Sequence, residues 1–125
     1  MTGRFLKVMI AGAAAASIHA AMAHGPEAPK FGGTTAAAGD LGFELAAQGD
    51  SVTLYVDDHG KPLATTGARG KLTVLNGTQK SEAELTPAAP NKLEAKGIKL
   101  SPGAKAVAEV TLASQKVVTV RFTIN

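Results

Sequence analysis

The chain of 125 residues contains no cysteine and no tryptophan, and it has a single tyrosine. The absence of cysteine excludes disulfides, thiolate zinc sites, iron–sulfur clusters and cysteine nucleophiles. The chain is too short for a multidomain enzyme and long enough for one domain with a modest core. Its net charge of +3 and its pI near 9.3 would indicate a nucleic-acid or anionic-membrane partner only if the folded domain carried that charge.

The first 23 residues differ in kind from the rest. Arg4 and Lys7 precede an apolar, alanine-rich run from Val8 to Ile18, and residues 21–23, Ala-Met-Ala, have the small-x-small pattern of a cleavage site. This order predicts a cleaved secretory signal peptide over residues 1–23 and a periplasmic protein. The alternatives are a membrane anchor or a buried helix, but the apolar run is short for a bilayer span. We therefore expect no membrane insertion after cleavage.

Removal of residues 1–23 leaves 102 residues and changes the totals. The remaining chain has 11 basic and 10 acidic side chains, because Arg4 and Lys7 are lost. Such a balance is not typical of a nucleic-acid-binding domain. All three methionines lie in the removed segment, so the expected mature chain has no sulfur ligand and only two histidines, His24 and His59.

Two kinds of pattern follow the signal peptide. Residues 24–39 are rich in Gly, Pro, Ala and Thr, with Phe31 as the one large apolar residue, which predicts a flexible arm. Over residues 40–125 apolar and polar residues alternate with a period of two between turn signals, and Asn76-Gly77 indicates a tight hairpin. The expected fold is all-β: a small immunoglobulin-like antiparallel β-sandwich of about seven strands.

Three details of that fold can be predicted in advance. We expect Pro87 and Pro90 to end a strand, because proline cannot donate to a sheet ladder. The last strand, around residues 118–124, is the most hydrophobic and is expected to be central. The inward-facing residues are expected to be Leu41, Phe43, Leu45, Val52, Leu54, Val56, Leu72, Val74, Ala106, Ala108, Val110, Leu112, Val118, Val120, Phe122 and Ile124.

The sequence has no pattern typical of catalysis. The mature serines lie in turn or strand-edge contexts without a nucleophile elbow. His59 and its neighbours Asp57 and Asp58 cannot form a triad, since adjacent residues on a strand point to opposite faces. We predict a protein that is not an enzyme.

A metal site is the sharper hypothesis. Cleavage after Ala23 would give His24 a free α-amine beside its imidazole, a chelating pair suited to Cu(II). If the arm folds back, Glu27, Asp57, Asp58 and His59 could complete a site for Cu(II) or Zn(II). The alternative is that both histidines are simply solvated and no metal binds.

Several short motifs, in order, resemble a family. They are Phe31-Gly32-Gly33, the strand Gly39-Asp40-Leu41-Gly42-Phe43-Glu44-Leu45, then Leu54-Tyr55-Val56 and Gly60-Lys61-Pro62-Leu63. Together they resemble the small periplasmic β-sandwich domain found alone or N-terminally in membrane-fusion (adaptor) proteins of bacterial heavy-metal efflux systems. The resemblance implies copper, zinc or cobalt handling and a metal-efflux envelope complex as partner. Phe31 stands where the family has a histidine, which leaves His24 and His59 as the nitrogen ligands.

Two functional hypotheses remain. The first is a periplasmic, non-enzymatic accessory or metal-binding protein linked to heavy-metal handling or efflux. The second is a metal-free periplasmic module that docks to an envelope protein through a sheet edge.

Overall fold

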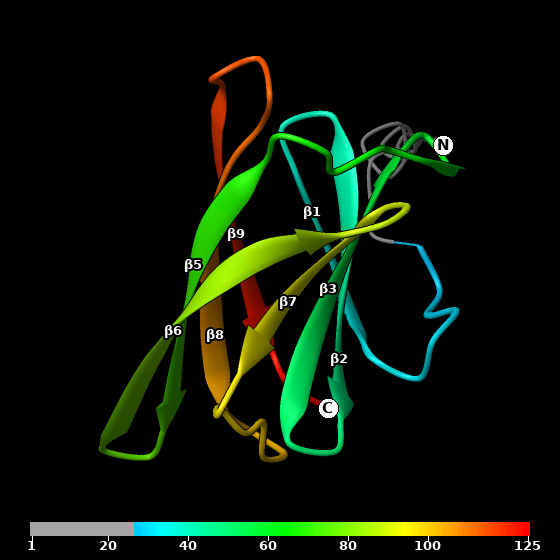
Figure 1. Ribbon diagram of the computed structural model, residues 1–125. Helices are drawn as coiled ribbons and strands as arrows, with labels where there is room; N and C mark the ends of the chain where they lie inside the picture. Colours follow the sequence, from blue (N-terminus) through cyan, green and yellow to red (C-terminus); the bar gives the residue numbers. More distant parts are fainter. Residues whose placement is uncertain (1–26) are drawn as a thin grey trace, which may run out of the picture.

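A computed structural model describes residues 27–125, and the predicted signal peptide and His24 lie outside these residues. The described part contains no helix, so none that could cross a membrane. Period-two alternation produces strands throughout, as expected for half-buried antiparallel pairs. They are β1 (Thr34–Ala38), β2 (Leu41–Gln48), β3 (Ser51–Asp58), β4 (Lys61–Pro62), β5 (Arg69–Asn76), β6 (Gln79–Ala88), β7 (Lys92–Lys96), β8 (Lys105–Thr111) and β9 (Val117–Thr123) (Figure 1).

The buried core follows the alternation. Most residues predicted to face inward are buried, and Leu41, Leu112 and Ile124 are half-buried at the margin of the core. The other members of the core are Leu85 from β6, Leu93 and Ala95 from β7, and Ala68, Ile98 and Ala104 from the connecting segments. One contiguous apolar cluster therefore holds all the long strands together, and burial of such side chains stabilises the fold by roughly 1.5–3 kcal/mol each.

All strand pairs are antiparallel, in the order β1-β2-β3-β7-β6-β5-β8-β9, with β4 on β3. The predicted all-β antiparallel class is confirmed. The layers differ from an immunoglobulin-like sandwich, since the sheet curls until it nearly closes into a barrel. β6 is the reason: its first part pairs with β5 and its last part with β7, so one strand belongs to both halves.

Pro87 does not end β6, contrary to expectation. β5 pairs with β6 only as far as Leu85, and Pro87 lies opposite Leu93 of β7. Hydrogen-bonding direction alternates along a strand, so the nitrogen of Pro87 points to the side that β5 has already left. Proline is tolerated there because no ladder hydrogen bond needs its missing N–H.

β9 is not central, although it is strongly apolar. It is the last strand in the sheet order and pairs only with β8. Its other side faces β1 across a seam, which we define as the contact between β1 and β9 (Figure 1). The backbone N–H of Asn125 donates to Oγ1 of Thr34 there, at 3.3 Å. The inward side chains of β9 are buried inside the curved sheet, although β9 forms a hydrogen-bonded ladder on one side only.

Two-residue loops join four of the strand pairs. In three of them the first loop residue is a glycine with a positive φ of 62°, namely Gly39, Gly49 and Gly77. A positive φ at this position suits the tight turns that match strand twist. The Asn76-Gly77 signal thus marks a real hairpin, but the loop residues are Gly77 and Thr78, and Asn76 is the last residue of β5.

The folded domain begins before Asp40. Residues 34–38, inside the segment expected to be a flexible arm, form β1 and pair with residues 41–45 of β2. The small Thr and Ala side chains that made this segment look disordered do not prevent pairing, because main-chain groups supply the ladder.

Candidate functional site

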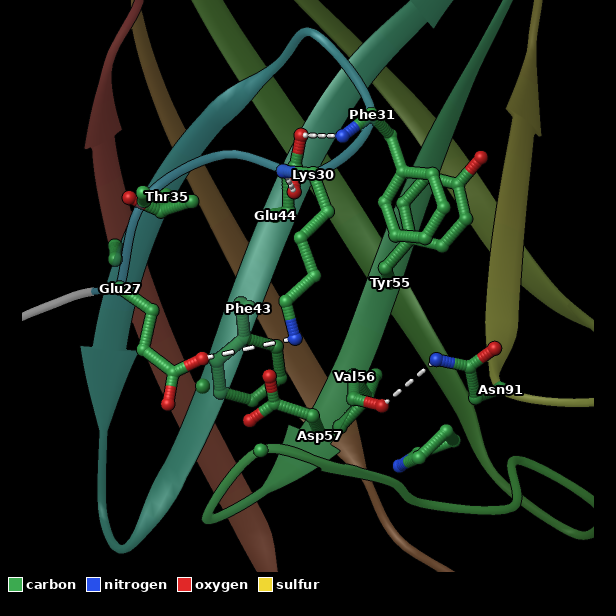
Figure 2. Close-up of a pocket in the computed structure, with 15 residues that line it drawn as sticks. Glu27, Lys30, Phe31, Thr35, Phe43, Glu44, Tyr55, Val56, Asp57 and Asn91 are labelled. Atoms are coloured by element: carbon green, nitrogen blue, oxygen red, sulfur yellow. Dashed lines mark hydrogen bonds and ion pairs between the residues drawn. The ribbon is translucent and has the colours of Figure 1, made fainter.

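Residues 27–33, which we call the strap, lie across the outer face of β2 and β3 (Figure 2). Glu44 of β2 fixes the strap. Its carboxylate accepts the backbone N–H of Lys30 on Oε1 and those of Phe31 and Gly33 on Oε2, each at 2.8 Å. The strap covers Glu44, which is only 6% exposed. Three charge-assisted hydrogen bonds offset the burial of this carboxylate.

The two glycines let the strap come so close. Gly32 has a φ of +73°, which side chains rarely adopt. A Cβ on Gly33 would collide with the carbonyl oxygen of Leu45. The Gly32-Gly33 pair therefore lets the chain turn and lie directly against the backbone of β2 before β1 begins.

An aromatic stack holds the middle of the strap. The ring of Phe31 lies on the ring of Tyr55, with centroids 3.8 Å apart and an interplanar angle of 8°. Tyr55 is directly opposite Glu44 in the β2–β3 register, so stack and carboxylate act on neighbouring strap residues. Phe31 is still 48% exposed. Tyr55 points away from the core, between the buried Leu54 and Val56, but the ring of Phe31 covers its outer face.

The strap forms one wall of a pocket with a volume of about 120 Å³. The other walls come from β1, β2, β3, the turn at Gly60 and Pro62, and Asn91. Inside it, the Nζ of Lys30 lies 3.8 Å from Oε1 of Glu27, and the Asp57 carboxylate faces the same space (Figure 2). Asn91 is held in place by donating from Nδ2 to the carbonyl of Val56 at 3.1 Å.

Asp57 depends on a glycine opposite it. Gly42 is the register partner of Asp57, and a Cβ on Gly42 would lie 2.5 Å from Oδ1 of Asp57. A side chain at position 42 would force the Asp57 carboxylate to shift. The missing side chain thus creates the space that Asp57 occupies.

His59 and Asp58 lie on the turn beyond the pocket. His59 and Gly60 form the two-residue loop between β3 and β4, with φ of 55° and 86°, as a type I′ turn requires. Nδ1 of His59 lies 2.6 Å from Oδ1 of Asp58, and both side chains are exposed. In the tautomer with a proton on Nδ1, this nitrogen donates to the Asp58 carboxylate and leaves Nε2 available to ligate a metal.

The structure brings some of the predicted metal-site residues together and separates others. Glu27 and Asp57 line one pocket, and Oε2 of Glu27 lies 3.8 Å from the place where Gly60 would carry a Cβ, next to His59. Asp58 and His59 face each other outside that pocket. Within residues 27–125 no group of three or more His, Asp or Glu side chains is close enough to hold a metal ion, and His24 lies outside this range.

Glu44, Lys30 and Asn91 were missed by sequence reasoning. Alternation with Phe43 and Leu45 places Glu44 on the outward face of the strand, a position typical of a solvated side chain. The groups that bury it are main-chain N–H groups of the strap, and these have no signature in the sequence. The Gly32-Gly33 pair was the one available signal for a close backbone approach.

The pocket therefore combines the carboxylates of Glu27 and Asp57, the Glu44 carboxylate that holds the strap, the ammonium group of Lys30 and an aromatic stack. This donor set suits a cation or a polar ligand better than an apolar one. Comparisons with known proteins add nothing to this: no protein-family model, no curated protein and no solved structure matches the chain.

Proposed function

We propose that the protein is an exported, periplasmic, non-enzymatic accessory protein of heavy-metal handling that binds Cu(II) or Zn(II) at the strap pocket. The observation that carries the proposal is the docking of the strap, which lies against the sheet so that Glu27 reaches the pocket of Asp57 beside the His59 turn. The export part rests on the predicted signal peptide, and the link to metal efflux rests on the family resemblance.

Chain length supports a contribution from His24. Three residues of extended chain span at most about 10 Å, and His24 precedes Glu27 by that many residues. After cleavage at Ala23, the α-amine and imidazole of His24 would therefore be tethered near the pocket. In this proposal, nitrogen ligands from His24 and His59 join oxygen ligands from Glu27, Asp57 and Asp58, a mixture suited to Cu(II) and Zn(II).

The test is calorimetric titration of the processed protein with Cu(II) and with Zn(II). We expect binding below the micromolar range, and a loss of at least about tenfold in affinity in His24→Ala, His59→Ala and Asp57→Asn, in line with the removal of one ligand. Asp40→Asn, in the β1–β2 loop, is the matched control and should bind like the wild type. Failure of both metals to bind below the micromolar range, or unchanged affinity in all three ligand variants, contradicts the proposal.

The second candidate function is a metal-free module that docks to an envelope protein through a sheet edge. The first part of β6 favours it, because residues 79–85 pair with β5 on one side only. An open edge of this kind can accept a further strand.

A further inference from the structure

The first part of β6 has an open strand edge. Residues 79–85 pair with β5, whereas the ladder to β7 begins only at Thr86. None of the other backbone hydrogen bonds in this part of the chain involves residues 79–85. In Figure 1 the β5–β6 hairpin projects at the lower left, clear of β7.

The hairpin loop determines which groups point to this edge. A two-residue loop makes its flanking residues, Asn76 and Gln79, a hydrogen-bonded pair. Bonding then alternates along β6, so Ser81, Ala83 and Leu85 bond to β5. The N–H and C=O groups of Lys80, Glu82 and Glu84 point to the open edge instead. The side chains of these three residues lie on the outer, exposed face.

We propose that this edge is a homodimer interface in which two copies of β6 pair antiparallel about a two-fold axis at Ser81. Lys80 of one copy then lies opposite Glu82 of the second copy, and the reverse pair forms on the other side of the axis. Each of these two pairs exchanges backbone hydrogen bonds and brings opposite charges together on the outer face. Lys71 stays beside Glu82, where its Nζ already lies 3.5 Å from Oε1.

The charges select this register over its neighbours. An axis at Glu82 would place two glutamates opposite each other, which is destabilising. An axis between two residues would place outer-face side chains against inner-face ones. Charged residues on an open edge usually prevent indiscriminate pairing; here the order Lys80, Glu82 also permits one matched arrangement with an identical strand.

The register predicts a specific cross-link. Ser81 faces its own copy in a non-hydrogen-bonded pair, with Cα atoms about 4.5 Å apart, which is within the range of a disulfide. Because the chain has no cysteine, Ser81→Cys introduces a single thiol. Under mild oxidation we expect Ser81→Cys to form a covalent dimer. Gln79→Cys is the control and should stay uncross-linked, because its own copy is four residues away along the strand, or about 13 Å.

Charge reversal tests the same strand register without a covalent cross-link. Sedimentation velocity of the protein purified after export should show a monomer–dimer equilibrium. Lys80→Glu should weaken dimerisation by about tenfold, since the substitution places like charges opposite each other. Combining Lys80→Glu with Glu82→Lys should restore the affinity of the dimer. Glu82→Pro should abolish it while keeping the fold, because the nitrogen of residue 82 points to the open edge and makes no bond to β5.

Circular dichroism of each variant shows whether it is folded, so a loss of dimer can be separated from a loss of structure. A wild-type chain that is monomeric up to about 1 mM overturns the proposal. So does an equal cross-linking yield from the two cysteine variants. A monomeric chain that captures a foreign strand in a manner sensitive to Glu82→Pro also overturns it, and would assign the edge to another protein.

Discussion

Two glutamates on the outer faces of two hairpins have opposite surroundings. Glu44, on the β2–β3 hairpin, is buried under the strap and accepts three backbone N–H groups. Glu82, on the β5–β6 hairpin, is exposed and is flanked by the ammonium groups of Lys71 and Lys80 at 3.5 and 3.4 Å. In the sequence both are polar residues at outward positions of an alternating strand.

The difference shows that an outward position on a strand does not determine whether a side chain is buried or exposed to solvent. At Glu44 the second layer is a segment of the same chain, so the carboxylate becomes a structural anchor. At Glu82 residues 27–125 supply no second layer, so the carboxylate interacts with exposed lysines in solvent, where ion pairs contribute little. The two hairpins therefore offer different opportunities: one has a pocket beneath a covering segment, and the other has an open edge.

Of the substitutions that test this difference, Glu44→Gln should lower stability the most. The amide removes the negative charge and places an NH₂ group against backbone donors, so we expect the free energy of unfolding to fall by about 2 kcal/mol. Urea unfolding measures the loss, and limited proteolysis should show faster cleavage within residues 27–33. Glu82→Gln is the matched control and should leave the free energy of unfolding nearly unchanged, because Glu82 is exposed. Equal effects at the two positions would contradict the anchor role of Glu44.

Phe31→Ala should have a smaller effect. It removes the stack on Tyr55, and such pairs contribute about 1 kcal/mol. Tyr55 is the only tyrosine and the chain has no tryptophan, so the tyrosine fluorescence and near-ultraviolet circular dichroism report directly on this stack. Val117→Ala, which also truncates an exposed apolar side chain, is the control and should leave the tyrosine signal unchanged. An unaltered signal in Phe31→Ala would mean that the rings do not stack in solution.

The smallest effect concerns protonation of Glu82. Lys71, and then Lys80, hold the pKa of this carboxyl below its usual value of 4.5. Because the folded-state pKa is the lower one, the stabilisation is present above the unfolded pKa and disappears as the pH falls through the folded pKa. Lys71→Met should raise the pKa of Glu82 toward 4.5 in an NMR titration, and high salt should do the same to the wild type. A pKa that responds to neither change would rule out the lysines as its cause.

Most of the residues buried on the inner faces of the strands could be predicted from the sequence. Val52, Leu54 and Val56 are fully buried, as their alternation requires, and the hairpin at Gly77 lies where its turn signal indicates. Period-two alternation reports which residues share a face, and that property survives any rearrangement of the strands. The all-β prediction is correct for that reason.

The arrangement of strands and the candidate site were harder to predict. Alternation does not show which strand lies beside which. The apolar character of β9 predicts a central position, whereas the strand is last in the sheet order and borders the seam. Nor does it reveal that β6 joins both halves of the sheet. The strap is held through main-chain N–H groups, which every non-proline residue carries. The docking of the strap on Glu44 therefore has no side-chain pattern in the sequence from which it could be predicted.

The seam between β1 and β9 has a consequence for the order of folding. The hairpins close short stretches of chain, whereas the bond between Asn125 and Thr34 joins residues 91 positions apart. Closing a loop of that length loses more chain entropy than closing a hairpin, and contacts of high sequence separation slow folding. The hairpins should therefore assemble first and the seam last. During unfolding the same seam is the natural place for the barrel to open, and the strap leads directly into β1 there.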